Sequence, residues 1–366
     1  MNKKQNDFGC FAVWEDALPL LSSIREHLCT NFELLGDVPI EWSKEHYYEN
    51  ARRLYQQEIP ANVPYEKLWT SHSHKIGSGL FHFFVVKDPN PNYRFEASVS
   101  GRVQLCNTNI TKCKTLYRSW FTAKYRVHSS NNISEFFEQT ALILGPEKLC
   151  LILDGNPILS EEPIQRDLEG AGGWRSFAHL FETLNLCTDY VILRSDHELT
   201  DHTPPEDIDI LTSDYQRFAS AANVKQFVPK RPYKGTVVVG CSTIPIDIRF
   251  IGDGYMDAVW QRVILDKTEK AGLWHVVDSE NHFFSLVYHC IVHKQQIKHA
   301  HLRTLEALSS DLFESGYVTI NDHEGMQQLL QLLRGYMIQQ RYKVTIPVDR
   351  GVVVNKRVAQ HRNESR

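Results

Sequence analysis

The chain has 366 residues, of which 42% are hydrophobic and 11% aromatic, and its net charge is −4. This length predicts about two domains, and the apolar content suffices for packed cores, so a largely disordered chain is excluded. The slightly acidic balance argues against a protein that binds nucleic acid through a broad basic face, and no apolar run reaches the roughly 18 residues of a membrane-spanning helix.

The first part of the chain combines short apolar strand patterns with helix patterns. Strands are expected over residues 8–14 and 79–88, and helices over residues 18–31, 44–57 and 133–145. Ser43 is placed to cap the second of these helices, and Gly145 to close the third. These elements predict an α+β domain over residues 1–147, which ends just after the turn-forming Gly145-Pro146 pair.

The later segments predict a second domain with a mixed sheet, followed by helices. Strands are expected over residues 149–154, 190–195, 207–212, 235–241 and 244–252, and helices over residues 176–187, 213–223, 257–269, 280–294, 298–314 and 323–338. We therefore expect an α+β or α/β domain over residues 148–296, a helical extension over 297–349 and a flexible basic tail over 350–366.

The eight cysteines are scattered along the chain and contain no CxxC pair. A chain of this length needs no disulfide bonds to stabilise it, and the apolar stretch near the N-terminus is too short for a secretion signal. We therefore expect a cytoplasmic protein with reduced thiols, and neither a disulfide framework nor a zinc ribbon.

The first domain contains four segments whose sequences and order along the chain are useful for comparison with known families. They are FAVWEDALP, GSGLFHFFVV, SGRVQLCNTNITKCKTLYRSWF and YRVHSSN. Together with the alternation of strands and helices, they resemble the motifs of the nucleoside diphosphate kinases over about residues 8–145. This resemblance implies a ferredoxin-like fold, in which helices pack on an antiparallel sheet.

The same resemblance implies a phosphate-transfer site in the first domain. His128 would be the histidine that accepts the phosphate, because a neutral imidazole nitrogen can attack a phosphorus and form a covalent intermediate. Two guanidinium groups suit the charge that is spread over phosphate oxygens. By their positions, the implied phosphate- and nucleotide-binding residues are Tyr55, Arg102, Thr108, Arg118 and Ser130.

The second domain contains aspartates that alternate with isoleucines. In a strand, Asp207 and Asp209 point to one face and Ile208 points to the other. Asp247 stands in the same apolar–acidic–apolar pattern on a later predicted strand. If the two strands are neighbours, three carboxylates converge, and this oxygen-rich group suits Mg²⁺ with nucleotide phosphates as further ligands.

This acidic pattern resembles the signature of the polymerase-β-type nucleotidyltransferases over about residues 150–295. The resemblance implies that Asp207, Asp209 and Asp247 are catalytic and hold Mg²⁺ or Mn²⁺, with a nucleotide as the donor substrate. Arg194 is a candidate phosphate ligand. The similarity of the second domain and the helical extension to bacterial surface-polysaccharide proteins implies a small-molecule or glycan acceptor.

Three histidines and one arginine lie close to this pattern in the sequence. His289 and His293 are one helical turn apart and could share a metal ion, but no HExxH glutamate lies between them. A helix that packs its apolar face inward and has His282, His289 and His293 at its polar edge is therefore favoured. We expect Arg249 to point to the face of its strand opposite Asp247.

Three functions remain open from the sequence. The leading hypothesis is an enzyme, a Mg²⁺-dependent nucleotidyl- or phospho-group transferase of surface-polysaccharide biosynthesis that acts through the three aspartates. The second is a phosphotransferase that acts through His128, independently of the aspartates. The third is an inactive nucleotide-binding or scaffold protein, in which replacing Asp207 or His128 leaves function intact. No nucleic-acid partner is expected, and the oligomeric state stays open.

Overall fold

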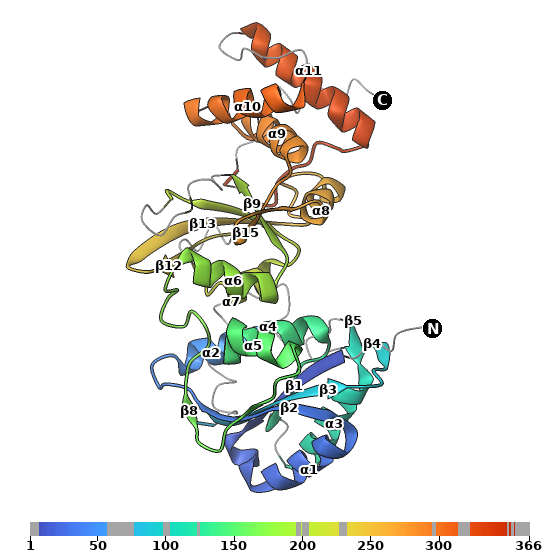
Figure 1. Cartoon of the computed structure of the whole chain (residues 1–366). Helices are drawn as coiled ribbons and strands as arrows, with labels where there is room; N and C mark the ends of the chain where they lie inside the picture. Colours follow the sequence, from blue (N-terminus) through green and yellow to red (C-terminus); the bar gives the residue numbers. More distant parts are fainter. Residues whose placement is uncertain are drawn as a thin grey trace. The chain divides into compact units, whose positions relative to one another are not determined.

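The structure is a computed structural model of the whole chain (Figure 1). It describes residues 7–56, 77–97, 103–122, 125–194, 199, 205–226, 233–294, 298–313, 323–349, 351–352 and 355. The protein is mixed α/β and forms two compact units. The first unit contains residues 1–188, 216–224 and 238–240, and the second contains residues 189–215, 225–237 and 241–366.

The first unit is built on a sheet with the strand order β6–β1–β3–β2–β7, in which β8 also pairs with β2. The strands are β1 (Asp7–Trp14), β2 (Glu33–Glu41), β3 (Leu80–Asp88), β6 (Val127–Ser129), β7 (Ile158–Leu159) and β8 (Ile164–Gln165). Within the run β6–β1–β3–β2 neighbouring strands are antiparallel, whereas β7 and β8 pair in parallel with β2. A separate antiparallel hairpin joins β4 (Tyr93–Ala97) and β5 (Val103–Asn107).

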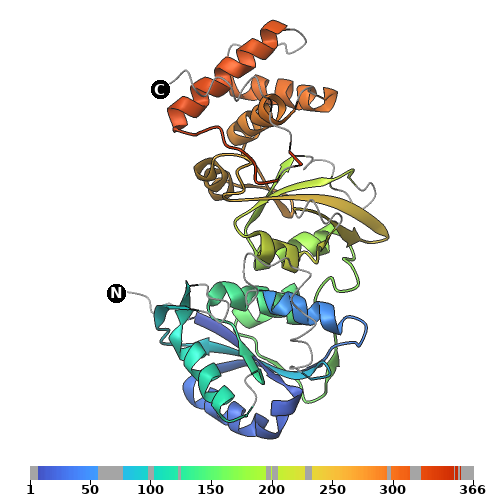
Figure 2. The ribbon, with the colours of Figure 1, turned by 180° about the vertical axis from the view of Figure 1, so that it is seen from behind.

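Helices cover both faces of this sheet (Figures 1 and 2). The helices of this unit are α1 (Leu21–Asn31), α2 (Tyr47–Leu54), α3 (Thr108–Ser119), α4 (Ile133–Leu144), α5 (Pro146–Leu153), α6 (Phe177–Cys187) and most of α7 (Tyr215–Ala221). Of these, α6 packs on α4 and α5. Phe11 of β1 packs with Tyr117 of α3 on one face. On the other face, Phe8 stacks on Phe136 of α4, and Trp14 donates a 2.6 Å hydrogen bond to Tyr55. Because both faces are covered, β1 is apolar along most of its length.

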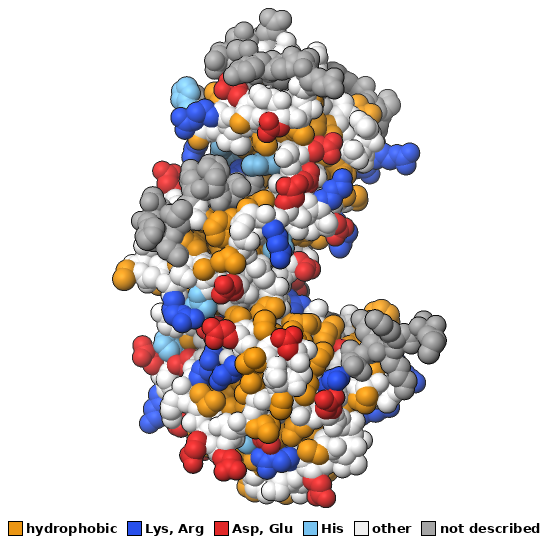
Figure 3. Space-filling view, viewed as in Figure 1, with side chains coloured by type: hydrophobic (Ala, Val, Ile, Leu, Met, Phe, Trp, Pro, Cys, Tyr) orange, Lys and Arg blue, Asp and Glu red, His pale blue; other side chains and the backbone are white. Residues whose placement is uncertain are grey.

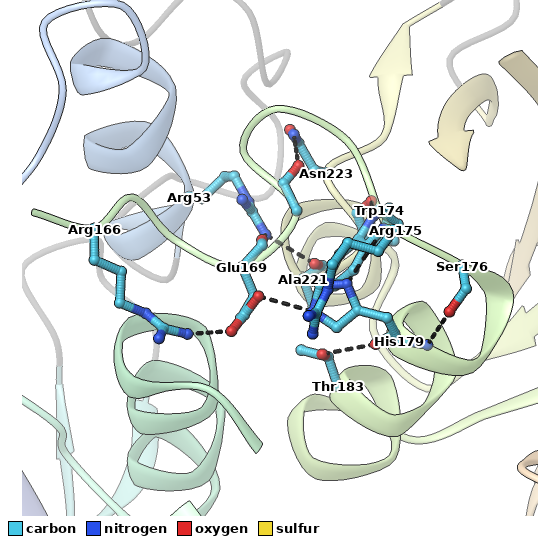
Figure 4. A network of polar contacts seen from close by, with 12 residues as sticks. Arg53, Arg166, Glu169, Trp174, Arg175, Ser176, His179, Thr183, Ala221 and Asn223 are labelled. Carbon is cyan, nitrogen blue, oxygen red and sulfur yellow. Dashed lines mark hydrogen bonds and ion pairs between the residues drawn. The ribbon is translucent and has the colours of Figure 1, made fainter. Parts of the chain in front are cut away.

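After residues of the second unit, the chain returns to the first unit with residues 216–224, here called the returning segment. A buried polar network joins this segment to the rest of the first unit (Figure 4). The Arg53 side chain, on α2, is 1% exposed, and its guanidinium donates hydrogen bonds to the carbonyl oxygens of Ser220 at 2.8 Å and Ala221 at 3.0 Å. It also donates to the Glu169 carbonyl oxygen at 2.8 Å. The Glu169 carboxylate lies 2.8 Å from Nε2 of His179 on α6. One guanidinium thus satisfies backbone acceptors from segments that are far apart in the sequence.

The sheet of the second unit has the strand order β11–β12–β13–β10–β9–β15–β14. The strands are β9 (Tyr190–Arg194), β10 (Ile208–Thr212), β11 (Lys225–Gln226), β12 (Lys234–Val239), β13 (Ser242–Phe250), β14 (Glu269–Ala271) and β15 (Trp274–Val276). β10 runs parallel to β13 and antiparallel to β9. In the sheet, β10 therefore lies between β9 and β13, two strands that are far from each other in the chain.

In the described residues, four helices and a π-helical turn complete the second unit. They are α8 (Ala258–Asp266), α9 (Ser279–Tyr288), the π-helix His289–His293, α10 (His299–Leu312) and α11 (His323–Gln340). Phe283 and Phe284 of α9 share one core with Leu305 of α10 and Leu333 of α11. The predicted helical extension is therefore part of the second unit, because its apolar faces complete the same core.

The prediction of a strand over residues 149–154 is wrong, because residues 149–153 belong to α5 and Asp154 is its C-cap residue. Pro146 at the start of the helix and the acidic Glu147 in its first turn favour a helix. Leu149 and Ile152, three positions apart, are buried on one side of it. A short apolar run does not distinguish a strand from a helix by periodicity alone.

The compact units also divide the chain elsewhere than at the predicted boundary after residue 147. Residues up to Thr188 belong to the first unit, since α5 and α6 pack with α4 there. Most of the predicted tail over residues 350–366 lies outside the described residues. None of the helices in the described part has the length and apolarity needed to cross a lipid bilayer. On the face shown in Figure 3, acidic and basic side chains are interspersed with hydrophobic ones.

Candidate functional site

The two predicted aspartate strands are neighbours in the sheet of the second unit. β10 and β13 run parallel, and Asp209 lies directly opposite Asp247 in their register. Asp207 stands immediately before β10, two positions from Asp209, and all three carboxylates line one pocket. Ile208 and Ile210 are buried. The condition for the carboxylates to converge, that the two strands are neighbours, is therefore met.

Asp209 is held by Arg194 at the end of β9. Nε of Arg194 lies 2.9 Å from Oδ2 of Asp209, and Nη2 lies 2.8 Å from Oδ1, so the ion pair is bidentate. Burial alone would raise the pKa of Asp209, but the charge of Arg194 outweighs it and lowers the pKa below its ordinary value. Arg194, the predicted phosphate ligand, thus lies among the carboxylates.

Asp247 is buried and faces two cations. Nη2 of Arg249 donates to its Oδ2 at 2.9 Å, and Nζ of Lys234 lies 2.7 Å from the same oxygen. Oδ1 of Asp247 lies 2.8 Å from Nη2 of Arg249, yet it is buried and accepts no hydrogen bond from any described residue. One carboxylate oxygen in the pocket wall therefore has unused acceptor capacity.

The expectation that Arg249 points away from Asp247 is wrong. The two residues are two positions apart in β13, so their side chains share a face of the sheet. The Arg249 guanidinium lies 4.6 Å from the ring centre of Tyr255, and its Nη1 lies 3.3 Å from Oδ2 of Asp349. These contacts fix a buried positive charge beside the carboxylates.

Asp207 differs from the other two carboxylates because its side chain is exposed and has no ion pair with a described residue. Reduced hydration raises its pKa, and the negative charge of Asp209 raises it further. A carboxylate with a raised pKa accepts a proton more readily than an ordinary one. The three aspartates therefore have different chemical properties although they line one pocket.

The end of α9 adds imidazoles to the same pocket. In the π-helical turn, a hydrogen bond joins Nδ1 of His289 to Oη of Tyr255, and Nε2 of His293 lies 2.8 Å from the Tyr255 carbonyl oxygen. Burial lowers the pKa of His289, and it lowers that of His293 to about 4. Both rings are therefore neutral near pH 7. A π-helical turn within a helix often occurs at a functional site.

Together these residues line a cavity of about 720 Å³. A cavity of this size is in the range that accommodates a small-molecule or cofactor-sized ligand. The sheet supplies Arg194, Asp207, Asp209, Lys234, Asp247 and Arg249, and the helices and the segment between them supply His282, His289, His293, Lys294, Lys298 and His301.

The chain matches no protein-family model, and no curated protein is significantly similar to it. The chemistry of this pocket is therefore what indicates a function. Its lining contains carboxylates, guanidinium and ammonium groups and neutral imidazoles. Such a combination suits a substrate that carries phosphate groups, because phosphate oxygens bind both cationic side chains and carboxylate-held metal ions.

The donor set of the pocket fits Mg²⁺ in its chemistry. Carboxylate oxygens are ligands that Mg²⁺ prefers, and Oδ1 of Asp247 is a buried oxygen without a hydrogen bond from a described residue. In the structure, Asp209 and Asp247 are bound by cationic side chains, and the described residues form no group of three or more ligands placed to hold a metal ion. Substrate phosphates would therefore have to complete the coordination.

The first unit buries the residue predicted to accept phosphate. His128 is 6% exposed, and neither ring nitrogen makes a hydrogen bond with a described residue. Its ring centre lies 4.7 Å from that of Tyr55, so these two predicted site residues do lie together. Burial lowers the pKa of His128 well below its ordinary value. The imidazole is therefore neutral but enclosed by protein.

The other predicted residues of the first unit bind protein groups. Oγ of Ser130 accepts a hydrogen bond from the Cys10 amide at 3.1 Å. Oγ1 of Thr108 donates to a carbonyl oxygen at 2.9 Å, and Nε of Arg118 donates to one at 2.7 Å. Arg102 lies outside the described residues. These side chains stabilise local backbone.

Several pocket residues were not predicted from the sequence. Lys298, His301 and Thr304 all line the cavity, and their spacing of three places them on one face of α10. That spacing is visible in the sequence, but nothing local indicates that this face meets the aspartate strands. No spacing pattern in the sequence indicates Lys234 or Tyr255 as pocket residues, because only the tertiary fold brings each of them to the pocket.

Proposed function

We propose that the second unit is a transferase that moves a nucleotidyl or other phosphate-linked group from a nucleotide to an acceptor. One observation supports this proposal above all others. Asp209 and Asp247 lie opposite each other on parallel strands, with Asp207 two positions away, at the wall of a cavity of about 720 Å³. Carboxylates so arranged beside cationic side chains suit the transfer of a charged phosphate group.

In this proposal Asp209 and Asp247 hold Mg²⁺, and Asp207 accepts a proton. A bound Mg²⁺ would supply Lewis-acid polarisation of the phosphate oxygens. Asp207 is exposed to the pocket and its pKa is raised, which suits removal of the proton from an acceptor hydroxyl. With a nucleoside triphosphate as donor, the acceptor oxygen bonds to the α-phosphorus, pyrophosphate leaves, and the hydroxyl proton passes to Asp207.

The cations of the sheet wall have two roles in the proposal. In the substrate-free protein, Arg194, Arg249 and Lys234 balance the charge of Asp209 and Asp247 at distances of 2.7–2.9 Å. This compensation allows carboxylates to be buried next to each other before substrate binds. A guanidinium has five donor hydrogens, so Arg194 and Arg249 can also bind phosphate oxygens.

We propose a ferredoxin-like arrangement for the first unit and no catalytic role for its histidine. The antiparallel order β6–β1–β3–β2, with helices on both faces, supports the first part of this proposal. The burial of His128 supports the second, because a phosphate acceptor must be reached by its donor. The resemblance to surface-polysaccharide proteins makes a polyol or glycan the first class of acceptor to examine.

The test is Mg²⁺-dependent turnover of labelled nucleoside triphosphates and CDP-polyols by the full chain. We expect Asp207→Asn to lower the rate about a hundredfold or more, because it removes the proton acceptor without disturbing an ion pair. Asp266→Asn at the exposed end of α8 is the matched control and should turn over like wild type. His128→Gln should keep the wild-type rate.

Two results would contradict the proposal. Turnover or acid-labile protein label that is lost in His128→Gln but kept in Asp207→Asn would identify a histidine phosphotransferase instead. Absence of turnover with every donor, by a wild-type protein that is folded, would favour a binding or scaffold function.

A further inference from the structure

The two sides of the pocket differ in charge. Among the described residues, the acidic ones that line it, Glu206 and the three aspartates, stand at or just before strands of the sheet. The stretch of chain from α9 to α10 contributes lysines, histidines and Thr304 to the lining, but no acidic residue within the described part of that stretch. The helical side of the pocket therefore has an excess of positive charge.

Two lysines of the helical side have no ion-pair partner among the described residues. Lys294 follows the π-helical turn and Lys298 precedes α10, and both side chains are exposed at the pocket. Neither forms an ion pair or a side-chain hydrogen bond with a described residue. In contrast, Arg194, Lys234 and Arg249 on the sheet are each bound to a carboxylate. Within the part of the chain that the structure describes, Lys294 and Lys298 therefore remain available to a ligand.

Neutral donors lie next to these lysines. His301 and Thr304 are on the first turns of α10 and line the cavity. Nδ1 of His301 lies 3.6 Å from Sγ of Cys290, so Nε2 is the ring nitrogen left for a ligand. Nδ1 of His293, a side chain that is 3% exposed and lines the same cavity, has no hydrogen-bond partner among the described residues. A multiply charged oxyanion could use several of these groups at once.

The lowered pKa values of three histidines agree with a positive potential on this side. Burial is the main cause of the lowered pKa values of His289, His293 and His301, and the charges of Arg194 and Lys294 lower all three further. The charge of Lys298 also acts on Asp207, so the two sides of the pocket lie within electrostatic range of each other. A ligand on the helical side would therefore lie close to the carboxylates.

We propose that Lys294, Lys298 and His301 form a subsite for a phosphate monoester, separate from the carboxylates that act in the transfer. Ammonium groups bind phosphate as point charges, and the dianion compensates the two unpaired lysines. This inference rests on the proposed function, because it assigns a second phosphate to the substrates of that same pocket. That phosphate belongs either to the acceptor or to the end of the donor's phosphate chain.

The test is calorimetric binding of inorganic phosphate, pyrophosphate, glycerol 3-phosphate and glycerol to the full chain without divalent metal. We expect wild type to bind the three phosphate probes and not glycerol. The double variant Lys294→Ala/Lys298→Ala should bind them about tenfold more weakly or worse, since it loses two charge-assisted contacts. Lys267→Ala/Lys270→Ala, which removes two exposed lysines of the same unit outside the pocket, should bind like wild type.

A second arm identifies the source of the phosphate. If glycerol 3-phosphate still binds when the protein is saturated with a non-hydrolysable nucleoside triphosphate, the subsite takes the phosphate of the acceptor. If the nucleotide displaces it and the double variant weakens nucleotide binding, the subsite takes the terminal phosphate of the donor. Either result supports a phosphate subsite on the helical side.

Two outcomes overturn the inference: no phosphate probe binds to wild type, or the lysine double variant binds all of them as tightly as wild type does. The assay requires no catalysis, so it separates this inference from the proposed function. Asp207→Asn should keep phosphate binding while losing transfer. If transfer fails in every donor assay but the lysines still determine phosphate binding, the proposed function fails and the subsite stands.

Discussion

Buried arginines serve different purposes in the two units. Arg53 and Arg249 are 1% and 3% exposed. Arg53 donates hydrogen bonds to the backbone carbonyl oxygens of Glu169, Ser220 and Ala221. These acceptors are neutral, and the main chain holds them in position. Arg249 binds the carboxylate of Asp247, which a ligand can engage instead. The first arrangement stabilises a fold, and the second leaves a charged group available for chemistry.

Replacing Arg53 should therefore destabilise the first unit. Arg53→Met keeps much of the side-chain volume but leaves three backbone acceptors without their donors. We expect a loss of about 3–5 kcal/mol in the free energy of unfolding, measured by urea denaturation. Arg175→Met, at an exposed residue of the same region (Figure 4), should change it by less than about 0.5 kcal/mol. Equal stability of the two variants would contradict the structural role of Arg53.

At the scale of elements, apolar spacing predicted most helices correctly. Of the two end signals expected, Gly145 closes α4 with a φ of 90°. The prediction that Ser43 caps the second helix is wrong, because the N-cap residue of α2 is His46 and no side chain caps it. A helix end such as the one at Gly145 depends on a few neighbouring residues, so it can be read from the sequence. Strand β2 was not predicted, although it pairs with β3 over nearly its whole length. Its neighbours in the sheet, rather than its own pattern, stabilise it.

The π-helical turn predicts a pH-dependent stability of the second unit. His293 has a pKa of about 4 in the folded protein, against 6.5 as its ordinary value, because burial and the charges of Arg249, Arg194 and Lys294 disfavour the imidazolium. Between these values the unfolded chain binds more protons than the folded one. Stability should therefore be constant above about pH 6.5 and fall as the pH decreases toward 4.

For His293 alone this loss is on the order of 3 kcal/mol at pH 4. His293→Gln should flatten the decrease in unfolding free energy between pH 6.5 and pH 4.5, measured by urea denaturation at each pH. The exposed His299→Gln is the control and should keep the wild-type slope. The prediction fails if the His293 variant has the same slope as the control, since the protonation of this ring would then be the same in both states.

At the scale of the whole molecule, the first unit is not a continuous piece of the chain. It includes residues 216–224 and 238–240, which follow residues of the second unit in the sequence. Nε1 of Trp174 donates to the Ala222 carbonyl oxygen at 2.9 Å, and Nδ2 of Asn223 donates to the Gly170 carbonyl oxygen at 2.7 Å. The stability of the first unit therefore depends on a segment that the sequence assigns to the second domain.

Chain fragments should reveal this dependence. A fragment of residues 1–147 lacks α5 and α6, which pack on α4, and we expect no cooperative thermal transition by circular dichroism. A fragment of residues 1–188 retains these helices but lacks the returning segment, so it should melt below the first transition of the full chain. A fragment 1–147 that melts cooperatively at the temperature of the full chain would contradict the division of the protein found in the structure.

Features that depend on contacts between neighbouring residues could be predicted from the sequence, whereas features that depend on contacts between distant segments could not. The alternation of Asp207, Ile208 and Asp209 sets the face on which the carboxylates lie, because side chains alternate along any strand. The position of Arg249 beside Asp247 follows from the same rule, although the expectation drawn from the sequence was the reverse. Helix ends and apolar faces are likewise properties of neighbouring residues.

Only the tertiary structure decides which distant segments meet. The register of Asp209 with Asp247, the ion pair with Arg194 and the approach of Lys298 and His301 all depend on sheet order and helix packing. The burial of His128 and the return of the chain to the first unit depend on them as well. Periodicity specifies which face of an element is apolar, but many pairings satisfy the same pattern, and the packing of the whole core selects one of them.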